Sequence, residues 1–271
     1  MKIDSVLLTG AGIFSMFGAS TNSLYSNITA LAYNYNYPIT PPSIPISIIL
    51  CAFNEEEMIE RTLRSILSQN IINKYPQFFE LIVVDNESTD NTAEIAKQYC
   101  QVITAPRGKL NARHWGINYA VGDIIVAVDA DVYYPPNYLN LMLRHYKNDN
   151  VVAVQGVSFD EGNALQKIGS IWIAAMTHKF GKRLHGASSS FLKQAYYQVG
   201  GFDLSINQFD VAEMLAEEEV SLYYKMKTIG EVFFDLKACC FHKNRGLHGS
   251  IARELRLTDR RALEIAGGQR F

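Results

Sequence analysis

The sequence has no excess of positive charge, few cysteines and no long apolar run, and each absence excludes a class of protein. It carries 25 Lys and Arg against 27 Asp and Glu, which gives a formal net charge of −2 over 271 residues. Without a basic excess there is little counterion release to gain on a polyanion, so we expect no nucleic acid partner. The length corresponds to one large domain or two small ones.

Cysteine is too scarce and too scattered to form a disulfide framework. The four cysteines are Cys51, Cys100, Cys239 and Cys240, and no two of them have Cys-x-x-Cys spacing. A thiol inside an apolar run behaves as a small hydrophobic group. We therefore expect a reducing compartment and a cytoplasmic location.

Charge is missing altogether from the beginning of the chain. No Asp, Glu, Lys, Arg or His occurs from Ser5 to Phe53. We expect residues 1–43 to form an uncharged arm in front of the main domain. The prolines between Pro38 and Pro45 cannot continue a helix, so they predict an extended connector at its end.

This arm is apolar enough to contact a membrane but too short to span one. Its apolar start, Val6 to Ala19, falls below the ~20 residues of a membrane-spanning helix. The tyrosines that follow are typical of a membrane interface; they are Tyr33, Tyr35 and Tyr37. Peripheral membrane contact, packing over the main domain and packing against a second subunit of a homo-oligomer stay open as alternatives.

Apolar segments of strand length alternate with helical patterns after residue 44. The expected strands are Ile46–Phe53, Leu81–Val84, Val102–Ile103, Ile124–Asp129, Val232–Asp235 and Ala238–His242. Runs this rich in β-branched residues are typical of strands buried on both faces of a parallel sheet. We predict a three-layer α/β/α domain with a mostly parallel central sheet and right-handed crossovers.

Polar side chains stand at the ends of three of these strands, where open α/β sheets bind ligands. They are Asn54 and Glu55, Asp85, and Asp129 with Asp131. Residues two apart in an extended chain project to the same side, so Asp129 and Asp131 can face one ligand across Ala130. Two carboxylates suit Mg²⁺ or Mn²⁺ holding a diphosphate. A polar turn is the alternative for this pair, and helix capping is the alternative for Asp85 and Asp90.

Several short motifs occur in order between residues 44 and 245. They are Ala52-Phe53-Asn54-Glu55-Glu56, Val83 to Thr92, Gly108-Lys109-Leu110-Asn111-Ala112-Arg113, Asp129-Ala130-Asp131, Gly186-Ala187-Ser188-Ser189-Ser190-Phe191 and Gly200-Gly201-Phe202-Asp203. Together they resemble the family 2 glycosyltransferases, which have the glycosyltransferase-A fold and use nucleotide-activated sugars. The resemblance implies an inverting hexosyltransferase that needs Mn²⁺ or Mg²⁺. Its donor would be a UDP- or GDP-sugar, and its acceptor a hydroxyl of a saccharide, a lipid-linked sugar or a protein.

The resemblance also implies roles for individual residues. The nucleotide-sugar pocket would be formed by Ala52, Phe53, Asn54, Glu55, Asp85, Arg113, Asp129 and Ala130, with Arg113 near the diphosphate. Asp131 would be the direct metal ligand and Asp129 would share the ion or face the ribose. His242 would be a further metal ligand, although a structural histidine is the alternative. The acceptor side would include Gly186, Ala187 and Ser188.

A catalytic base is expected in the acidic run Glu217-Glu218-Glu219, which stands where the family carries an acidic pair before a helix. Lys225, Met226 and Gly230 fix a register that aligns Glu219 with the base. Glu218 is the base if the register differs by one. Adjacent carboxylates repel one another, and this repulsion raises the pKa of at least one of them, which suits a general base. A solvated helix start is the alternative.

The end of the chain predicts a basic amphipathic helix over residues 246–271, which could lie on anionic lipid or dock on the body.

We divide the domain before it, 44–245, into a nucleotide-binding half, 44–135, and an acceptor-binding half, 136–245. No long apolar segment follows the catalytic region and Gln-x-x-Arg-Trp is absent, so we do not expect a processive synthase with its own channel. A catalytically silent relative that binds nucleotide sugar or a partner protein, and a sugar nucleotidyltransferase, stay open as alternatives.

Overall fold

The computed structural model describes residues 29–34, 36–161, 183–204 and 212–242, with the side chains of residues 160 and 212–217 excepted. The first part of the uncharged arm, Tyr35, the side chain of Glu217 and the predicted basic helix lie outside these residues. None of the helices found within the described ranges is both long enough and apolar enough to cross a membrane.

Within the described residues, the strands form one eight-stranded sheet in the order β3-β2-β1-β4-β7-β6-β8-β5. The strands are β1 (Ile46–Ala52), β2 (Phe79–Asp85), β3 (Gln101–Thr104), β4 (Ile124–Asp129), β5 (Val132–Tyr133), β6 (Val151–Asp160), β7 (Ser189–Leu192) and β8 (Glu231–His242). Strands β3, β2, β1 and β4 are mutually parallel, whereas β7 runs antiparallel to β4 and β6. The predicted α/β domain with a mostly parallel sheet is confirmed.

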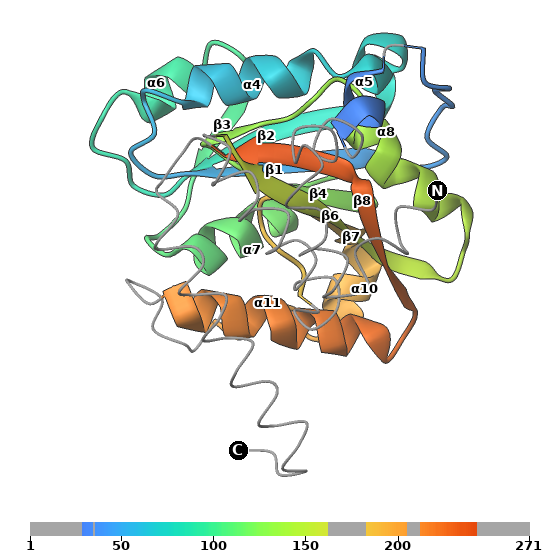
Figure 1. Cartoon of the computed structure of the whole chain (residues 1–271). Coiled ribbons are helices and arrows are strands. Elements are labelled where there is room, and N and C mark those ends of the chain that lie inside the picture. The colour runs from blue at the N-terminus through green and yellow to red at the C-terminus, as the bar shows by residue number, and fades with distance from the viewer. Residues whose placement is uncertain (1–28, 35, 162–182, 205–211, 243–271) are drawn as a thin grey trace, which may run out of the picture.

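Helices cover both faces of this sheet, which gives three layers (Figure 1). One face carries α4 (Ile59–Leu67), α5 (Asn70–Lys74), α6 (Thr92–Ala96) and α8 (Tyr138–Leu143), and the other carries α7 (Lys109–Tyr119), α10 (Lys193–Gln198) and α11 (Ala212–Lys227). Short 3₁₀ turns follow α5 and α8, at Pro76–Phe78 and Arg144–Lys147.

The strand β1 shows how the sequence produces these layers. All seven of its residues are buried. Ile48 and Leu50 belong to the core under α4, whereas Ile49 and Cys51 belong to the core under α7. Successive residues of a strand point to opposite faces, so an uninterrupted apolar run can fill both cores at once.

The described part of the arm packs on α8. Ala32 is fully buried in the core, and its carbonyl accepts a hydrogen bond from the Asn137 backbone N–H at 3.0 Å. The Asn140 side chain donates to the Pro38 carbonyl at 2.9 Å. Tyr37 and Ile39 pack against the same core. For residues 29–45, these contacts are made with the main domain.

The prediction of two separate late strands is wrong, because Glu231–His242 is one strand. It pairs with β6 from Val151 to Asp160, but the register shifts between Gln155 and Val157. Gly156 lies at this irregularity, and a Cβ there would come within 2.5 Å of the Ala238 carbonyl oxygen. Asp235 lies in β8 at this irregularity and is buried, at 4% exposure.

Asp235 holds a buried ionic cluster at this bulge. Its Oδ2 lies 2.7 Å from Arg144 Nη2 and 2.8 Å from His145 Nε2. Its Oδ1 accepts a hydrogen bond from the Lys237 backbone N–H at 2.9 Å. Arg144 also donates to the Tyr37 hydroxyl. The cluster therefore joins β8, the turn after α8 and the arm.

Replacing Asp235 with asparagine is expected to lower the free energy of unfolding at neutral pH by about 2 kcal/mol, because Arg144 and His145 lose a buried partner. Burial alone would raise the pKa of Asp235, but the hydrogen bond from His145 and the charge of Arg144 lower it below 3.8. This stabilisation is present above the unfolded pKa and is lost as pH falls through the lower folded value. Urea unfolding below pH ~4 should show a steeper loss for the wild type than for the variant. Equal pH slopes would contradict this role.

Candidate active site

Three parallel strands bring polar residues to one edge of the sheet. In the strand register Asp85 of β2 pairs with Ala52 of β1, and Asp129 of β4 pairs with Cys51 of β1. Asp85 and Asp129 therefore flank the end of β1 on its two sides. Both carboxylates are buried, at 5% and 6% exposure. The structure thus brings together the strand ends that the sequence selects.

The loops that follow β1 and β2 are locked to each other by side chains. Asn54 Oδ1 accepts a hydrogen bond from the Thr89 backbone N–H at 2.8 Å, and the Asn54 N–H donates to Ser88 Oγ at 3.0 Å. The Glu55 N–H donates to Thr92 Oγ1 at 2.8 Å. Asn54 has a φ of 52°, in the left-handed region that asparagine tolerates better than most residues. Its side chain is therefore engaged in shaping the loop.

Comparing Asn54→Ala with Asn54→Gly separates the cost of the left-handed backbone from the loss of the side-chain hydrogen bonds. Both variants lose the same hydrogen bonds to the second loop, but only alanine must hold a φ of 52° with a Cβ. We expect Asn54→Ala to lower the free energy of unfolding by about 1 kcal/mol more than Asn54→Gly. Urea unfolding of the two proteins measures the difference. Equal stability would mean that the left-handed backbone costs nothing here.

Asp85 and Asp90 differ in what they contact. Asp90 bonds the first turn of the next helix, because its Oδ1 accepts from the Thr92 N–H at 3.0 Å, although the N-cap residue of α6 is Asn91. Its Oδ2 accepts from the Glu56 N–H at 3.1 Å. Among the described residues, Asp85 Oδ2 accepts a long hydrogen bond, 3.4 Å, from the Ser88 N–H. Within the described chain, Asp85 Oδ1 is buried and has no hydrogen-bond partner. The helix-cap alternative therefore describes Asp90 and leaves Asp85 Oδ1 unexplained.

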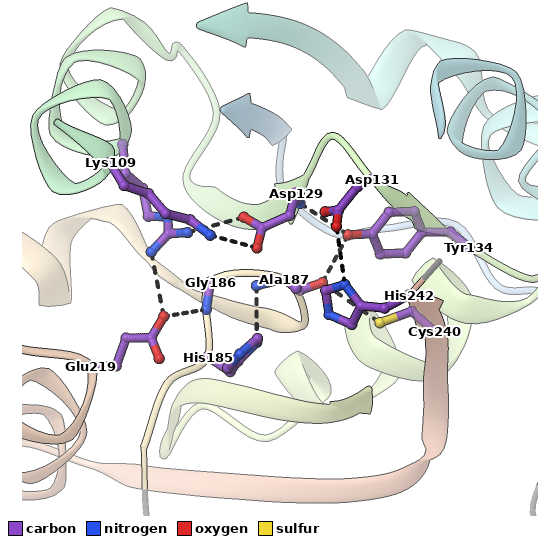
Figure 2. A network of polar contacts seen from close by, with 11 residues as sticks. Lys109, Asp129, Asp131, Tyr134, His185, Gly186, Ala187, Glu219, Cys240 and His242 are labelled. Carbon is purple, nitrogen blue, oxygen red and sulfur yellow. Dashed lines mark hydrogen bonds and ion pairs between the residues drawn. The ribbon is translucent and has the colours of Figure 1, made fainter. Parts of the chain in front are cut away.

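Asp129 is held between two cations. Lys109 Nζ lies 2.7 Å from its Oδ2 (Figure 2). Arg113 Nη2 lies 3.2 Å from its Oδ1. Burial alone would raise the pKa of Asp129, but the charges of Lys109 and Arg113 hold it well below its ordinary value. Its backbone N–H donates to the Tyr134 hydroxyl at 3.1 Å. Both oxygens of Asp129 therefore have protein partners.

Asp131 faces His242 across the end of the sheet. Strand β5 begins at Val132, which pairs with His242 of β8, and Asp131 Oδ2 lies 3.7 Å from His242 Nδ1 (Figure 2). This separation is too long for a hydrogen bond. Two donors bound at about 2.1 Å to one ion lie about 3 to 4 Å apart, so the pair fits a divalent cation.

The three predicted metal donors do not converge. Among the described residues, no group of three or more His, Cys, Asp or Glu side chains is placed to hold a metal ion. Asp129 is occupied by Lys109 and Arg113, so only Asp131 and His242 face each other. Mg²⁺ and Mn²⁺ sites commonly use one or two protein ligands and take the rest from phosphates and water. The residues present therefore fit such an ion as a two-donor site.

Glu219 lies on the other side of Arg113. Its Oε1 accepts a hydrogen bond from the Gly186 backbone N–H at 2.8 Å and lies 3.7 Å from Arg113 Nη1. Figure 2 shows Glu219 on the Gly186 side of the network and Asp131 with His242 on the other. In the described part of the chain, both contacts of the carboxylate go to Oε1, which leaves Oε2 for another group.

Glu218 points to a different place. Its Oε2 accepts a hydrogen bond from the Asp203 backbone N–H at 2.9 Å, which ties the loop before α11 to the helix. Both Glu218 and Glu219 are buried, at 6% and 7% exposure. The expected position before a helix is wrong, because both residues lie inside α11 (Ala212–Lys227). A solvated helix start therefore describes neither residue, and of the two only Glu219 contacts Arg113.

The predicted acceptor segment lies partly in this network. Gly186 contacts Glu219, and the Ala187 carbonyl accepts a hydrogen bond from the Tyr134 hydroxyl at 2.8 Å. Ser188 is turned away, because its Oγ accepts from the Gln155 side chain at 2.9 Å. Tyr134 thus connects the end of β4 to the segment that leads into β7.

Other predicted residues line the rim or support it. Phe53 is half-buried, with the Arg107 guanidinium 4.0 Å above its ring. The Ala130 carbonyl accepts from Thr62 Oγ1 at 2.6 Å, which anchors the Asp129–Asp131 turn on α4.

Sequence reasoning missed the roles of Lys109, Tyr134 and His185. Lys109 stands directly after Gly108 at the start of α7, inside one of the motifs. This position in the sequence could have indicated its role. Nothing in the sequence around Tyr134 indicates its role. Burial and the charge of Arg183 lower the pKa of His185 well below its ordinary value. Its Nδ1 accepts a hydrogen bond from the Ala187 N–H at 3.2 Å.

Comparison with known proteins agrees with this architecture. The model of the family described as Glycosyl transferase family 2 matches residues 47–197. The poly-beta-1,6-N-acetyl-D-glucosamine synthase of Staphylococcus epidermidis is 30% identical over 186 residues, which cover 62% of this chain and 44% of that protein. The chain thus spans less than half the length of the curated relatives that it matches.

Two solved structures share the fold. The mannosyltransferase PcManGT from Pyrobaculum calidifontis, in complex with GDP-Man and Mn²⁺, has a TM-score of 0.63 at 18% identity, covering 99% of this chain and 77% of that one. Glucosyl-3-phosphoglycerate synthase from Mycobacterium tuberculosis, with Mn²⁺, UDP-glucose and phosphoglyceric acid, has a TM-score of 0.53 at 20% identity, covering 88% and 81%.

The sheet order, the two helical layers and these likenesses define a glycosyltransferase-A fold. Because the family model covers more than half of the residues, the chain belongs to glycosyl transferase family 2.

Proposed function

We propose that this chain is a divalent-metal-dependent glycosyltransferase that moves a hexose from a nucleoside diphosphate to an acceptor hydroxyl with inversion at the sugar carbon. One observation carries the proposal. The cation-held Asp129, the Asp131–His242 pair and the Glu219 carboxylate lie in one network at the carboxyl edge of the sheet. Family membership supports the reaction class. A relative named as a polysaccharide synthase, and two neighbours in structure that were solved with nucleotide sugars and Mn²⁺, support the donor class and the metal.

Asp85 supports the binding of a nucleotide at this edge. Its Oδ1 is buried without a partner among the described residues, and a buried carboxylate oxygen gains from a hydrogen-bond donor. A base N–H or a ribose hydroxyl would supply that donor. Phe53 follows Ala52, the register partner of Asp85, and its ring lies under the Arg107 guanidinium. Asn54 and Glu55 would act by fixing the loop.

Lys109 supplies positive charge for a departing nucleoside diphosphate. Its side chain is 41% exposed, although Nζ lies 2.7 Å from Asp129 Oδ2. Charge builds up on the diphosphate as the sugar bond breaks, and a positioned cation stabilises it. A bound Mn²⁺ or Mg²⁺, held by Asp131 and His242, would neutralise the same diphosphate and orient it.

Glu219 acts as the general base in this proposal. Inversion by a single displacement needs a carboxylate that takes the acceptor's hydroxyl proton on the face opposite the leaving group. Glu219 lies on the Gly186 side, away from Asp131, and its Oε2 is the oxygen left to receive that proton. Glutamate is longer than the aspartate usual in the family, so the base reaches farther from α11.

We also infer that the site joins two halves of one domain, 44–135 for the donor and 136–245 for the acceptor. Asp85, Lys109 and Asp131 come from the first half and Glu219 from the second. His242 departs from this division, because a residue of the second half faces Asp131. Saccharides are the first acceptors to test, because the staphylococcal relative is named as a polysaccharide synthase.

A donor screen tests the proposal. The purified protein is titrated with UDP-glucose, UDP-N-acetylglucosamine and GDP-mannose by calorimetry, with and without Mn²⁺, and the products of slow donor hydrolysis are identified. We expect one donor to bind only with the metal and to release nucleoside diphosphate with a sugar of inverted anomeric configuration. Formation of a nucleoside triphosphate and a sugar 1-phosphate from the same donor when pyrophosphate is added would identify a nucleotidyltransferase. Binding without any turnover, with water or with saccharide acceptors, would identify a silent relative.

A further inference from the structure

Arg113 is a cation buried between two carboxylates that come from different halves of the domain. Its side chain is 2% exposed. Nη2 lies 3.2 Å from Asp129 Oδ1, at the end of β4, and Nη1 lies 3.7 Å from Glu219 Oε1, on α11. A guanidinium can hold two carboxylates at once because its donors are spread over a rigid plane. Arg113 therefore fixes the distance between the donor side and the proposed base.

Gly186 provides the space for this guanidinium. A Cβ at position 186 would lie 1.7 Å from Arg113 Nη2, 2.1 Å from Cζ and 2.3 Å from Nη1. All three distances are far below contact distance, so no other residue fits without moving Arg113. The Gly186 N–H also donates to Glu219 Oε1 at 2.8 Å. Gly186 thus leaves space for the Arg113 guanidinium and also donates a hydrogen bond to Glu219, the carboxylate that this guanidinium faces.

Burial separates Arg113 from a ligand in solution. Its two terminal nitrogens face protein carboxylates, and the Cys51 thiol lies beside it on the sheet. Its Nε has no hydrogen-bond partner among the described residues, but this nitrogen is buried as well. Lys109, in contrast, pairs with Asp129 from the open side and is 41% exposed. Of these two cations, Lys109 is the one that a donor diphosphate can reach.

We propose that Arg113, seated on Gly186, is a positioning residue for Glu219 and not a ligand of the donor diphosphate. This inference rests on the proposed transferase function. The cation keeps Glu219 at a fixed position relative to Asp129, so the acceptor's proton meets the base while the donor is bound. Misplacing a reacting group by about 1 Å can cost ~10² in rate, whereas the donor contacts would stay in place.

The test separates the rate of transfer from the binding of donor. Gly186→Ala, Arg113→Gln and Arg113→Lys are compared with wild type for kcat, for donor Kd measured by calorimetry with Mn²⁺, and for thermal unfolding. We expect Gly186→Ala and Arg113→Gln to lower kcat about 10²-fold and to change donor Kd by less than about threefold. Arg113→Lys should recover part of the loss, because it keeps the charge and lacks the fork.

A double variant tests whether the two residues act through one contact. Gly186→Ala combined with Arg113→Gln should lose little more rate than either single variant, because both remove the same interaction. Arg64→Gln is the matched control, since Arg64 is 66% exposed and pairs with Glu60 on α4. It should leave both kcat and Kd unchanged.

Two results would overturn the inference. One is a donor Kd that weakens as much as kcat falls, which would make Arg113 a donor ligand. The other is full additivity of the two substitutions. If Arg113→Gln does not fold, Gly186→Ala decides alone, because it retains every charge. Failure of the wild type to transfer or hydrolyse any donor would instead contradict the proposed function, and this is measured before any variant.

Discussion

Replacing Glu219 with glutamine is expected to lower the rate of sugar transfer by ~10²–10⁴ while donor binding stays unchanged, because the change removes the general base but keeps its shape. The glutamine oxygen can still accept the hydrogen bond that Gly186 donates to Oε1. The loss should therefore appear in kcat. Single-turnover transfer with the donor found by the screen measures it, and calorimetry measures donor binding in the same protein.

Glu218→Gln decides between the two neighbouring carboxylates. Glu218 accepts from the Asp203 N–H at 2.9 Å, and an amide oxygen can do the same. We expect only a small effect on transfer. If Glu218→Gln abolishes transfer and Glu219→Gln does not, the base is Glu218 and the contact with Arg113 has another purpose.

Replacing Asp131 with alanine is expected to weaken Mn²⁺-dependent donor binding by at least about 100-fold. The variant removes the carboxylate of a two-donor pair and leaves His242 as a single donor. Calorimetry of donor binding and titration with Mn²⁺ alone are two independent measurements. Removing the metal from the wild type with EDTA should produce the same weakening.

Asp149→Ala is the matched control, because Asp149 is exposed in the turn before β6. It should bind metal and donor as the wild type does. Metal-dependent donor binding that survives in Asp131→Ala would show that Asp131 is not a ligand. If metal-dependent donor binding survives in Asp131→Ala but is lost in Asp129→Ala, the metal ligand is Asp129. The ion would then displace Lys109 or Arg113 from that carboxylate.

The parallel half of the fold could be predicted because its strands are buried on both faces. Such strands appear as uninterrupted apolar runs, and the polar residue after each run marks the edge where ligands bind. Asp85, Asp129 and Asp131 were selected on this basis, and they lie at one edge of the sheet. Here the physical cause is local, since each strand and its end are contiguous in sequence.

The pairings across the site could not be predicted, because they join residues that are remote in sequence. Nothing near Arg113 indicates that its guanidinium lies on Gly186, and a lone glycine has many explanations. The resemblance indicated the diphosphate, whereas the structure surrounds this cation with Asp129 and Glu219. The bulge at Asp235 was also hidden, because a charged residue in an apolar run normally indicates the end of a strand.

The single strand β8 has a consequence for how the site assembles during synthesis. Strands β1, β2 and β4 pair with one another within residues 46–129, so the nucleotide edge depends on early parts of the chain. His242 reaches Asp131 only after β8 has paired with β6 and β5. Long-range pairing of this kind forms late, and chains fold as they emerge from the N-terminus. A nascent chain would therefore possess its nucleotide edge before it could retain a metal ion, and metal dependence would be the last property that the domain acquires.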